Sequence, residues 1–254
     1  MGNGLPSGPV SSRVSKLSDV PLPASKNRID RAGDLIREWW TTPDINRIDV
    51  DQELRAAAVL MFAFRAGFQD PLVRVTMGMR SFVRTEGAPV LVTQRLKRAP
   101  TIAGKLARMP TVRLCQMQDI AGCRAILPSQ PEVYDVVRRI RRRSWDIRRL
   151  DDYMAKPKAT GYRAVHVVVR RRGRLVEIQL RTPAQQRWAA EVDRAAGQIG
   201  LGLKDGQGPP ELVAAFAELA EEIAHSGVDA ASHARLDEAF QAIRQQVRGY
   251  IPTK

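Results

Sequence analysis

The feature that most constrains this chain is a pair of apolar runs on either side of a basic turn, in "GYRAVHVVVRRRGRLVEIQLRT", residues 161–182. Runs rich in Val, Ile and Leu that flank a short glycine-containing turn are typical of a β-hairpin. A two-residue loop at Arg172 and Gly173 sets one register, whereas a three-residue loop would break it. The two-residue loop gives the pairs Arg171–Arg174, His166–Gln179 and Val168–Glu177.

Alternation of side chains along the two predicted strands separates polar from aliphatic positions. One face carries an aromatic ring, an imidazole, a carboxylate, an amide and a guanidinium, contributed by Tyr162, His166, Glu177, Gln179 and Arg181. The opposite face of the second strand carries Val176, Ile178 and Leu180 and is expected to pack on the core. The polar face fits a catalytic surface, and equally an ordinary solvated face with a cross-strand ion pair.

The charge of the chain is unevenly distributed. The sequence holds 41 Lys and Arg against 27 Asp and Glu, which gives a net charge of +14. Residues 1–182 carry a net charge of +17, while residues 183–254 are acidic by 3. Six basic residues and no acidic residue lie between Glu86 and Asp119. A regional positive field of this kind predicts a polyanionic partner, such as nucleotide phosphates or RNA.

The cysteines and the hydropathy indicate a cytoplasmic protein with no membrane partner. Cys115 and Cys123 match no zinc-binding spacing and make no disulfide framework, so both are expected to be reduced. We interpret no apolar run as a signal peptide or a membrane span.

The pattern along the chain predicts a leader, a group of helices, an α/β core and closing helices. Residues 1–25 contain 13 Gly, Pro or Ser and are expected to be disordered. Residues 26–89 are predicted to be N-terminal helices, 90–196 the core and 197–254 the C-terminal helices, after a glycine-rich break at 197–208. Helices are predicted at 28–40, 48–67, 71–85, 131–143, 182–199, 209–225 and 229–248, although 71–85 is also compatible with a strand. Short strands are expected within 119–127 and 145–153. The expected fold is α/β (α+β), a mixed sheet flanked by helices.

Two pairs of sequence segments carry a resemblance to a known family. "RLKRAPTIAGKLAR" is followed by "DIAGCRAIL", and "GYRAVHVVV" is followed by "EIQLRT". In this order and spacing, over roughly residues 90–190, the segments resemble the signature of RelA/SpoT-type alarmone synthetases. The resemblance implies a pyrophosphokinase fold related to nucleotidyltransferases. It also implies transfer of the β,γ-pyrophosphoryl group of ATP to a 3′-hydroxyl, with Mg²⁺ as cofactor.

The resemblance assigns the basic segment to ATP. Arg95, Lys97 and Lys105 match the family's ATP-binding positions, and Thr101 stands where the family usually has Ser. Arg124 and Arg98 are weaker candidates for the same role. A solvated loop is the alternative reading, but the absence of acidic residues here favours phosphate binding.

The resemblance also assigns two catalytic carboxylates. Asp119 matches the metal-binding aspartate, although a lone Asp before a strand is more often a turn residue. Glu177 matches the second carboxylate, which would activate the acceptor hydroxyl, share the metal, or both. Magnesium needs only one or two carboxylates besides phosphate oxygens, so this sparse set suffices.

The acceptor side is assigned in the same way. Tyr162 matches the ring that stacks on the acceptor base, and the positions assigned to the acceptor are Tyr162, His166, Gln179, Lys156 and Lys158. Arg181 is expected to organise the second strand instead. Thr160 departs from the family's usual Asn, and the helix after the hairpin lacks the common His and aromatic residues, which places the acceptor's identity in question.

The residues and the resemblance are compatible with three functions. The sequence contains no His-Asp dipeptide, so the family's hydrolase domain is not expected and the chain fits a stand-alone synthetase. The first function is a synthetase that makes (p)ppGpp from ATP and a purine nucleotide, GDP or GTP. The second is a toxin that pyrophosphorylates the 3′ end of tRNA and is neutralised by an antitoxin protein, because seven of the twelve residues 138–149 are Arg. The third is a non-catalytic nucleotide- or RNA-binding module.

Overall fold

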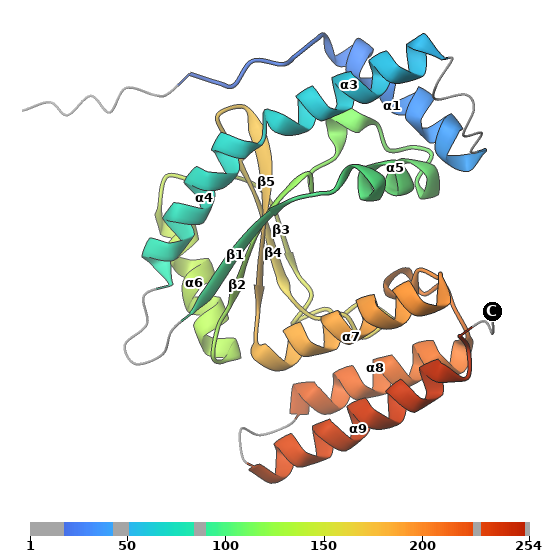
Figure 1. Cartoon of the computed structure of the whole chain (residues 1–254). Helices are drawn as coiled ribbons and strands as arrows, with labels where there is room; N and C mark the ends of the chain where they lie inside the picture. Colours follow the sequence, from blue (N-terminus) through green and yellow to red (C-terminus); the bar gives the residue numbers. More distant parts are fainter. Residues whose placement is uncertain (1–17, 43–50, 84–89, 226–229, 252–254) are drawn as a thin grey trace, which may run out of the picture.

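The central element is a mixed β-sheet flanked by helices (Figure 1). The computed structural model describes residues 18–42, 51–83, 90–225 and 230–251. The strands are β1 (Leu91–Leu96), β2 (Ala121–Ile126), β3 (Asp146–Asp152), β4 (Val165–Arg171) and β5 (Arg174–Arg181), in the order β1-β2-β5-β4-β3. Only β2 and β5 run parallel among these neighbours, and the other pairs are antiparallel. The expected mixed sheet is confirmed.

The hairpin adopts the predicted register. His166 pairs with Gln179, Val168 with Glu177 and Arg171 with Arg174. The loop residues Arg172 and Gly173 both have positive φ, 47° and 76°. Two positive φ angles match the right-handed twist of the strands, which is why such two-residue turns close hairpins.

One face of the sheet packs against the larger of two hydrophobic cores. Alternate residues of β4 and β5 enter this core, including Val165, Val167, Val176, Ile178 and Leu180. The helices that contribute to it are α1 (Lys26–Thr41), α3 (Gln52–Ala66), α4 (Gln69–Phe82), α5 (Ala99–Arg108) and α6 (Gln130–Arg142). Ser25, Asp51 and Ser129 accept backbone hydrogen bonds at the starts of α1, α3 and α6 and thereby set where these helices begin.

The smaller core lies at the C-terminal end of the chain. It joins Tyr162 and Ala164 to α7 (Pro183–Ile199), α8 (Pro210–His225) and α9 (Ala230–Arg248). Trp188 on α7 donates from Nε1 to the Phe216 carbonyl of α8 at 2.7 Å. Two short 3₁₀ turns, η1 (Leu114–Gln116) and η2 (Leu203–Asp205), complete the described elements. The predicted domain boundary at 196 falls inside α7, which the structure groups with α8 and α9.

The predicted helices are confirmed in the described parts of the chain, with shifts of a few residues at their ends. The segment 71–85 is helical over α4 rather than a strand. The predicted leader needs a correction, because residues 18–25 are held against the hairpin. Val20 donates from its backbone to the Arg172 carbonyl at 3.0 Å, and Arg172 donates to the Ser18 carbonyl at 2.8 Å. Residues 1–17 lie outside the described residues.

Among the described residues, one helical stretch, Gln52–Phe82, is long and apolar enough to cross a membrane by length and composition alone. The stretch is two helices, α3 and α4, separated at Gly67 and Phe68. Neither helix alone reaches the ~20 residues that a bilayer requires. Both helices bury one side in the larger core, and Val59, Phe62, Val73 and Met77 remain exposed on them.

Candidate active site

The carboxylate of Glu177 lies on the polar face of the hairpin and is held by two neighbours. His166 Nδ1 is 3.0 Å from Glu177 Oε1, and Gln179 Nε2 donates to Oε2 at 2.7 Å. Burial alone would raise the pKa of Glu177, but the His166 and Gln179 contacts outweigh it and hold the pKa below its ordinary value. Glu177 is therefore ionised at neutral pH.

A chain of hydrogen bonds connects Glu177 to a buried arginine. Tyr162 Oη is 2.6 Å from His166 Nε2, and Arg181 Nη2 donates to the same hydroxyl at 2.5 Å. Because Glu177 accepts from His166 Nδ1–H, the neutral imidazole has Nε2 free to accept from the tyrosine hydroxyl. The four side chains form a directional relay from Arg181 through Tyr162 and His166 to Glu177. The predicted clustering of Tyr162, His166, Glu177 and Gln179 on one face is confirmed.

Asp119 lies just before β2, between two lysines. Lys97 Nζ is 2.9 Å from its Oδ2, and Lys105 Nζ is 2.8 Å from its Oδ1. Burial opposes ionisation of Asp119, but the two positive charges lower its pKa overall. The negative charge of Asp119 in turn opposes ionisation of Glu177, which places the two carboxylates within electrostatic reach of each other.

The remaining residues of the predicted ATP group surround the start of α5. Thr101 lies exposed in the first turn of α5, and no side chain caps that turn. The free N–H groups and positive dipole of a helix start favour a phosphate. Arg95 lies exposed on β1, and its charge acts on Arg124 of β2. Burial lowers the pKa of Arg124, and the charges of Arg181 and Arg95 lower it further.

The predicted stacking residue is not open to solvent. Tyr162 is only 6% exposed; its ring meets Tyr153 edgewise at 5.8 Å between centroids and packs at a tilt against Trp188 at 6.2 Å. The Lys158 ammonium lies 5.4 Å from its ring centre and 5.2 Å from that of Tyr153. A base that stacked on Tyr162 would have to displace Lys158, which is exposed, as is Lys156.

Several site residues escaped the sequence analysis or received a lesser role in it. Arg181 is 3% exposed and also donates to Gln179 and Gln186, so it organises the strand as expected. Tyr153 packs on His166 with ring centroids 5.3 Å apart. The sequence feature that could have identified Tyr153 is an aromatic residue shortly before Lys156 and Lys158. Thr160, the departure from the family pattern, contacts the Lys204 carbonyl at 3.5 Å.

A magnesium ion fits the donor set only with help from substrate. Within the described ranges, no cluster of three or more His, Cys, Asp or Glu side chains is arranged to hold a metal. Asp119 and Glu177 supply two ionised carboxylates near each other, and Mg²⁺ characteristically takes one or two carboxylates plus phosphate oxygens and water. The residues present therefore fit a metal that arrives with a triphosphate.

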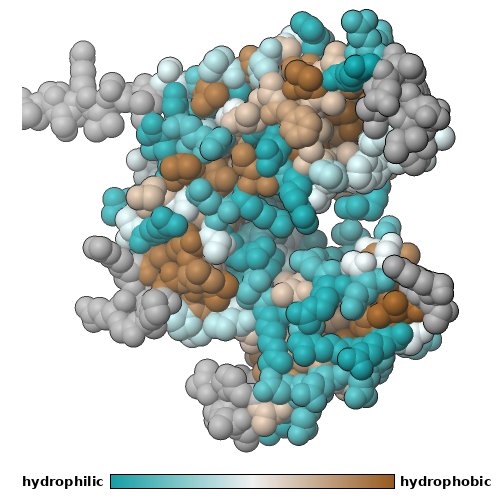
Figure 2. Space-filling view, in the orientation of Figure 1, coloured by the Kyte–Doolittle hydropathy of each residue, from teal (hydrophilic) through white to brown (hydrophobic). Residues whose placement is uncertain are grey.

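The surface in front of these side chains is polar. Figure 2 shows a hollow, largely hydrophilic surface between the part of the molecule that carries α5 and the part that carries α7. A separate cavity lies at the hairpin turn.

Comparisons with known proteins agree with this geometry. Residues 94–195 match the family described as "Region found in RelA / SpoT proteins". An uncharacterized protein of Mycobacterium tuberculosis is 33% identical over 214 residues, 81% of this chain and 70% of that protein. The GTP pyrophosphokinase YjbM of Bacillus subtilis is 31% identical over 168 residues, 62% of this chain and 72% of that protein.

A solved structure gives the same result for the fold. Small alarmone synthetase 1 from Bacillus subtilis, bound to its product pppGpp, matches with a TM-score of 0.51 and 27% identity, over 72% of this chain and 94% of that one. The fold and the site define a pyrophosphokinase, an enzyme of the (p)ppGpp synthetase type. The chain belongs to the RelA/SpoT family.

Proposed function

We propose that this enzyme transfers the β,γ-pyrophosphoryl group of ATP to the 3′-hydroxyl of a purine nucleotide, GDP or GTP, and so makes (p)ppGpp. The observation that carries the proposal is the pair of ionised carboxylates on one polar face. Asp119 is held between two lysines, and Glu177 ends the relay from Arg181.

The ATP triphosphate is assigned to the basic side of the face. Lys97 and Lys105 already bind a carboxylate, so they present ammonium groups where phosphate oxygens would replace or share it. The uncapped start of α5, with Thr101, adds N–H donors. We also assign Arg95 and Arg124 to the ATP site, because they lie on the adjacent strands β1 and β2.

In the reaction, the acceptor O3′ forms a bond to the β-phosphorus of ATP while the bond between that phosphorus and the bridging α,β-oxygen breaks. The products are AMP, a nucleotide 3′-diphosphate and one proton. The depressed pKa of Glu177 makes it a weak base that stays charged, which suits orienting the hydroxyl and binding a metal. Its two hydrogen-bonded neighbours fix the direction of its free lone pairs.

Asp119 and Glu177 would hold Mg²⁺ at the triphosphate. The ion would supply neutralisation of the negative charge on the transferred group. Lys97 and Lys105 would supply the same kind of stabilisation from the protein side.

On the acceptor side, His166 and Gln179 orient Glu177, and Lys156 and Lys158 are exposed for contact with the acceptor's phosphates. We keep Tyr162 as the stacking ring on the condition that Lys158 moves. Movement of Lys158 would uncover the face of the Tyr162 ring that its ammonium now covers.

The tRNA alternative depended on the arginines of residues 138–149. Arg139 donates to the Phe82 carbonyl at 2.6 Å, and Arg143 lies over the Phe82 ring. Arg149 pairs with Asp151 at 2.8 Å. Because these arginines have local structural partners, the nucleotide acceptor is the better supported choice. Both carboxylates of the site are in place, which weighs against a non-catalytic module.

The test is an incubation of the protein with γ-labelled ATP, Mg²⁺ and either GDP, GTP or tRNA, followed by chromatography of the products. Label in a guanosine 3′-diphosphate supports the proposal. Label in the 3′ end of tRNA, with none in GDP or GTP, would select the toxin instead. No transfer to any acceptor would leave the binding module. The Glu177→Gln variant serves as the background for each arm.

A further inference from the structure

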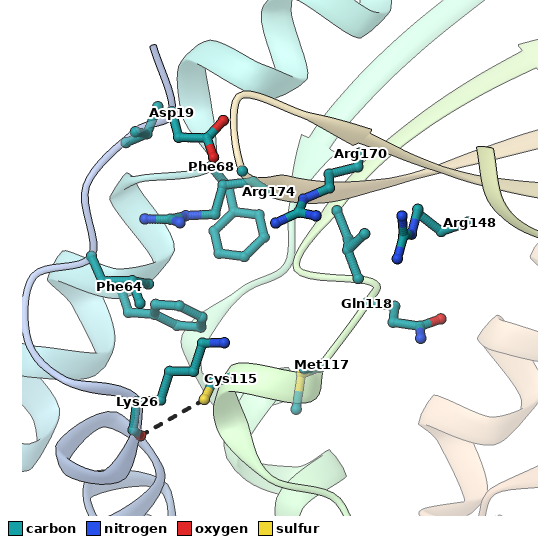
Figure 3. A pocket seen from close by; sticks show the side chains of 14 residues that line it. Asp19, Lys26, Phe64, Phe68, Cys115, Met117, Gln118, Arg148, Arg170 and Arg174 are labelled. Carbon is teal, nitrogen blue, oxygen red and sulfur yellow. Dashed lines mark hydrogen bonds between the residues drawn. The ribbon is translucent and has the colours of Figure 1, made fainter. Parts of the chain in front are cut away.

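A cavity lies at the hairpin turn, between the N-terminal segment and the sheet. It has a volume of about 600 Å³, a size typical of small-molecule sites. Its walls come from the N-terminal segment at Asp19–Leu22, the residues before Asp119, the start of β5 and the facing ends of β3 and β4. Figure 3 shows the side chains that surround it.

Basic side chains dominate the lining. Lys26, Arg148, Arg170 and Arg174 contribute four positive charges, and Asp19 is the one carboxylate among the lining residues. In Figure 3 the guanidinium group of Arg170 lies beside the Phe68 ring, Arg148 stands apart from it, and the Lys26 ammonium points toward the space between the elements. Within the described part of the chain, Arg170 and Lys26 form no ion pair, so their charges are not neutralised by the protein.

The backbone of β3 is shaped to bring two of these charges together. The β3–β4 pairing shifts between Ile147 and Arg149, which leaves Arg148 as the extra residue of a bulge. Bulges re-aim a side chain that regular pairing would place elsewhere. Arg170 pairs with Asp146 in the ladder, and Arg148 forms an ion pair with the same Asp146 at 3.3 Å, so both arginines lie at this end of the sheet.

Two polar atoms of the lining have no hydrogen-bond partner in the described structure. They are Arg174 Nε, a donor, and Gln118 Oε1, an acceptor, and both are buried. Arg174 is 6% exposed and packs over the rings of Phe64 and Phe68. Its Nη2 donates a hydrogen bond to the Pro21 carbonyl. Buried polar groups are normally satisfied, and an unmatched donor at a cavity wall is a position for a ligand or its water.

The cavity adjoins the active site without containing its predicted residues. By strand alternation, Arg170 lies on the same face as His166, and Leu175 on the same face as Glu177. Gln118 immediately precedes Asp119. The catalytic face therefore continues into the cavity toward the hairpin turn.

We infer that this cavity is a second anion site that binds a compact polyphosphate, either free or as the phosphate arm of a nucleotide. Guanidinium groups in pairs match phosphate oxygens in geometry and charge. Lys26 supplies a further ammonium from α1, and the buried Arg174 supplies a fixed positive charge behind it.

The test uses tripolyphosphate as the probe and isothermal titration calorimetry as the measurement. The Lys97→Gln/Lys105→Gln protein removes the two lysines of the catalytic site, so any remaining binding reports on the cavity. We expect this protein to bind one tripolyphosphate. Adding Arg148→Gln and Arg170→Gln should weaken that binding at least tenfold. Both arginines are exposed, so these changes leave the core intact.

Arg171→Gln is the matched control, because Arg171 is the exposed neighbour on the opposite strand face and does not line the cavity. It should bind the probe as tightly as its parent. Loss of all binding in the Lys97→Gln/Lys105→Gln protein would overturn the inference, as would equal affinity with and without Arg148 and Arg170. Repeating the titration with ATP distinguishes a nucleotide from free polyphosphate. The test does not depend on transfer activity, so it stands or fails separately from the proposed reaction.

Discussion

His166 and Glu177 are joined across the β4–β5 hairpin by a 3.0 Å contact between Nδ1 and Oε1, although these two residues are not paired opposite each other in the ladder. The contact is diagonal, since His166 pairs with Gln179 and Glu177 pairs with Val168. It aligns the imidazole so that its other nitrogen meets Tyr162, and it keeps the carboxylate ionised in a largely buried position.

Glu177→Gln is expected to reduce pyrophosphoryl transfer by ~10²–10⁴-fold, the usual effect of losing one catalytic group. The amide keeps the size of the side chain but not the charge that orients the hydroxyl or binds a metal. ATP affinity, measured by titration without acceptor, should change little because the triphosphate is assigned to Lys97 and Lys105. Exposed Glu218 on α8 gives the control substitution, Glu218→Gln. Normal turnover in Glu177→Gln would remove this residue from the mechanism.

His166→Ala should shift the acidic limb of the pH–rate profile to higher pH. Burial raises the pKa of Glu177, and the hydrogen bond from His166 is the largest effect that lowers it. Without the imidazole, the effect of burial is less opposed, so the pKa of Glu177 rises. The carboxylate is then protonated at a higher pH. In the native protein the stability contributed by ionised Glu177 is present above its unfolded pKa and is lost as the pH falls through its depressed folded pKa.

The control for this shift is His225→Ala, because His225 is exposed at the end of α8, where its Nδ1 contacts the Glu221 carbonyl. Its pH–rate profile should coincide with that of the native enzyme. An unchanged acidic limb in His166→Ala would show that Glu177 does not control that limb.

Tyr162→Phe and Tyr162→Ala separate the structural role of this residue from stacking. Phe keeps the ring but leaves an Arg181 N–H without its partner, which should lower the free energy of unfolding by ~1–3 kcal/mol. Ala also empties a buried space and should cost ~3–5 kcal/mol. If the ring stacks on the acceptor, only Ala should weaken acceptor binding, by ~1–3 kcal/mol. Equal acceptor affinity in all three proteins, measured below the melting temperature, would exclude stacking.

Gly161→Ala should destabilise the protein by more than ~2 kcal/mol. Gly161 has φ of +84°, and an added Cβ would lie 2.7 Å from Ala220 Cβ and 2.9 Å from Ala217 Cα on α8. Gly197→Ala is the contrasting change, because nothing lies within 4 Å of an added Cβ there and the residue is helical. That variant should be neutral or up to ~1 kcal/mol more stable, because alanine has the higher helix propensity. Thermal unfolding of both variants checks the pair, and equal melting temperatures would contradict the packing argument.

The sequence analysis predicted the hairpin and the polar face because both depend on local alternation and on a short turn. It did not predict the partners of the turn, which come from distant segments. Arg172 adopts a positive φ while its guanidinium pairs with Asp70 of α4 at 2.7 Å and holds the Ser18 carbonyl. No local pattern carries that information, so residues 18–25 were wrongly assigned to a disordered leader.

The burial of Tyr162 was missed for the same kind of reason. The motif identified the residue, but its environment is set by Trp188 and by α8, which follow it in sequence by more than twenty residues. Tyr153 lacked a motif assignment altogether, and only the fold brings it against His166. The sequence therefore identified the aromatic residues of the motif. It did not predict which face of each ring is buried and which is exposed.

The two hydrophobic cores meet at the start of β4, where Ala164 belongs to the smaller core and Val165, the first residue of β4, to the larger one. Successive residues of one chain segment are thus packed in two different cores. The relay from Arg181 to Glu177 connects the two cores, because Tyr162 packs against the C-terminal helices and Glu177 lies on strand β5 of the central sheet. Any partial unfolding of α7–α9 would release Tyr162 and disconnect Arg181 from His166, even with the sheet intact. Amide hydrogen exchange in α8 and catalytic competence would therefore report on the same opening event.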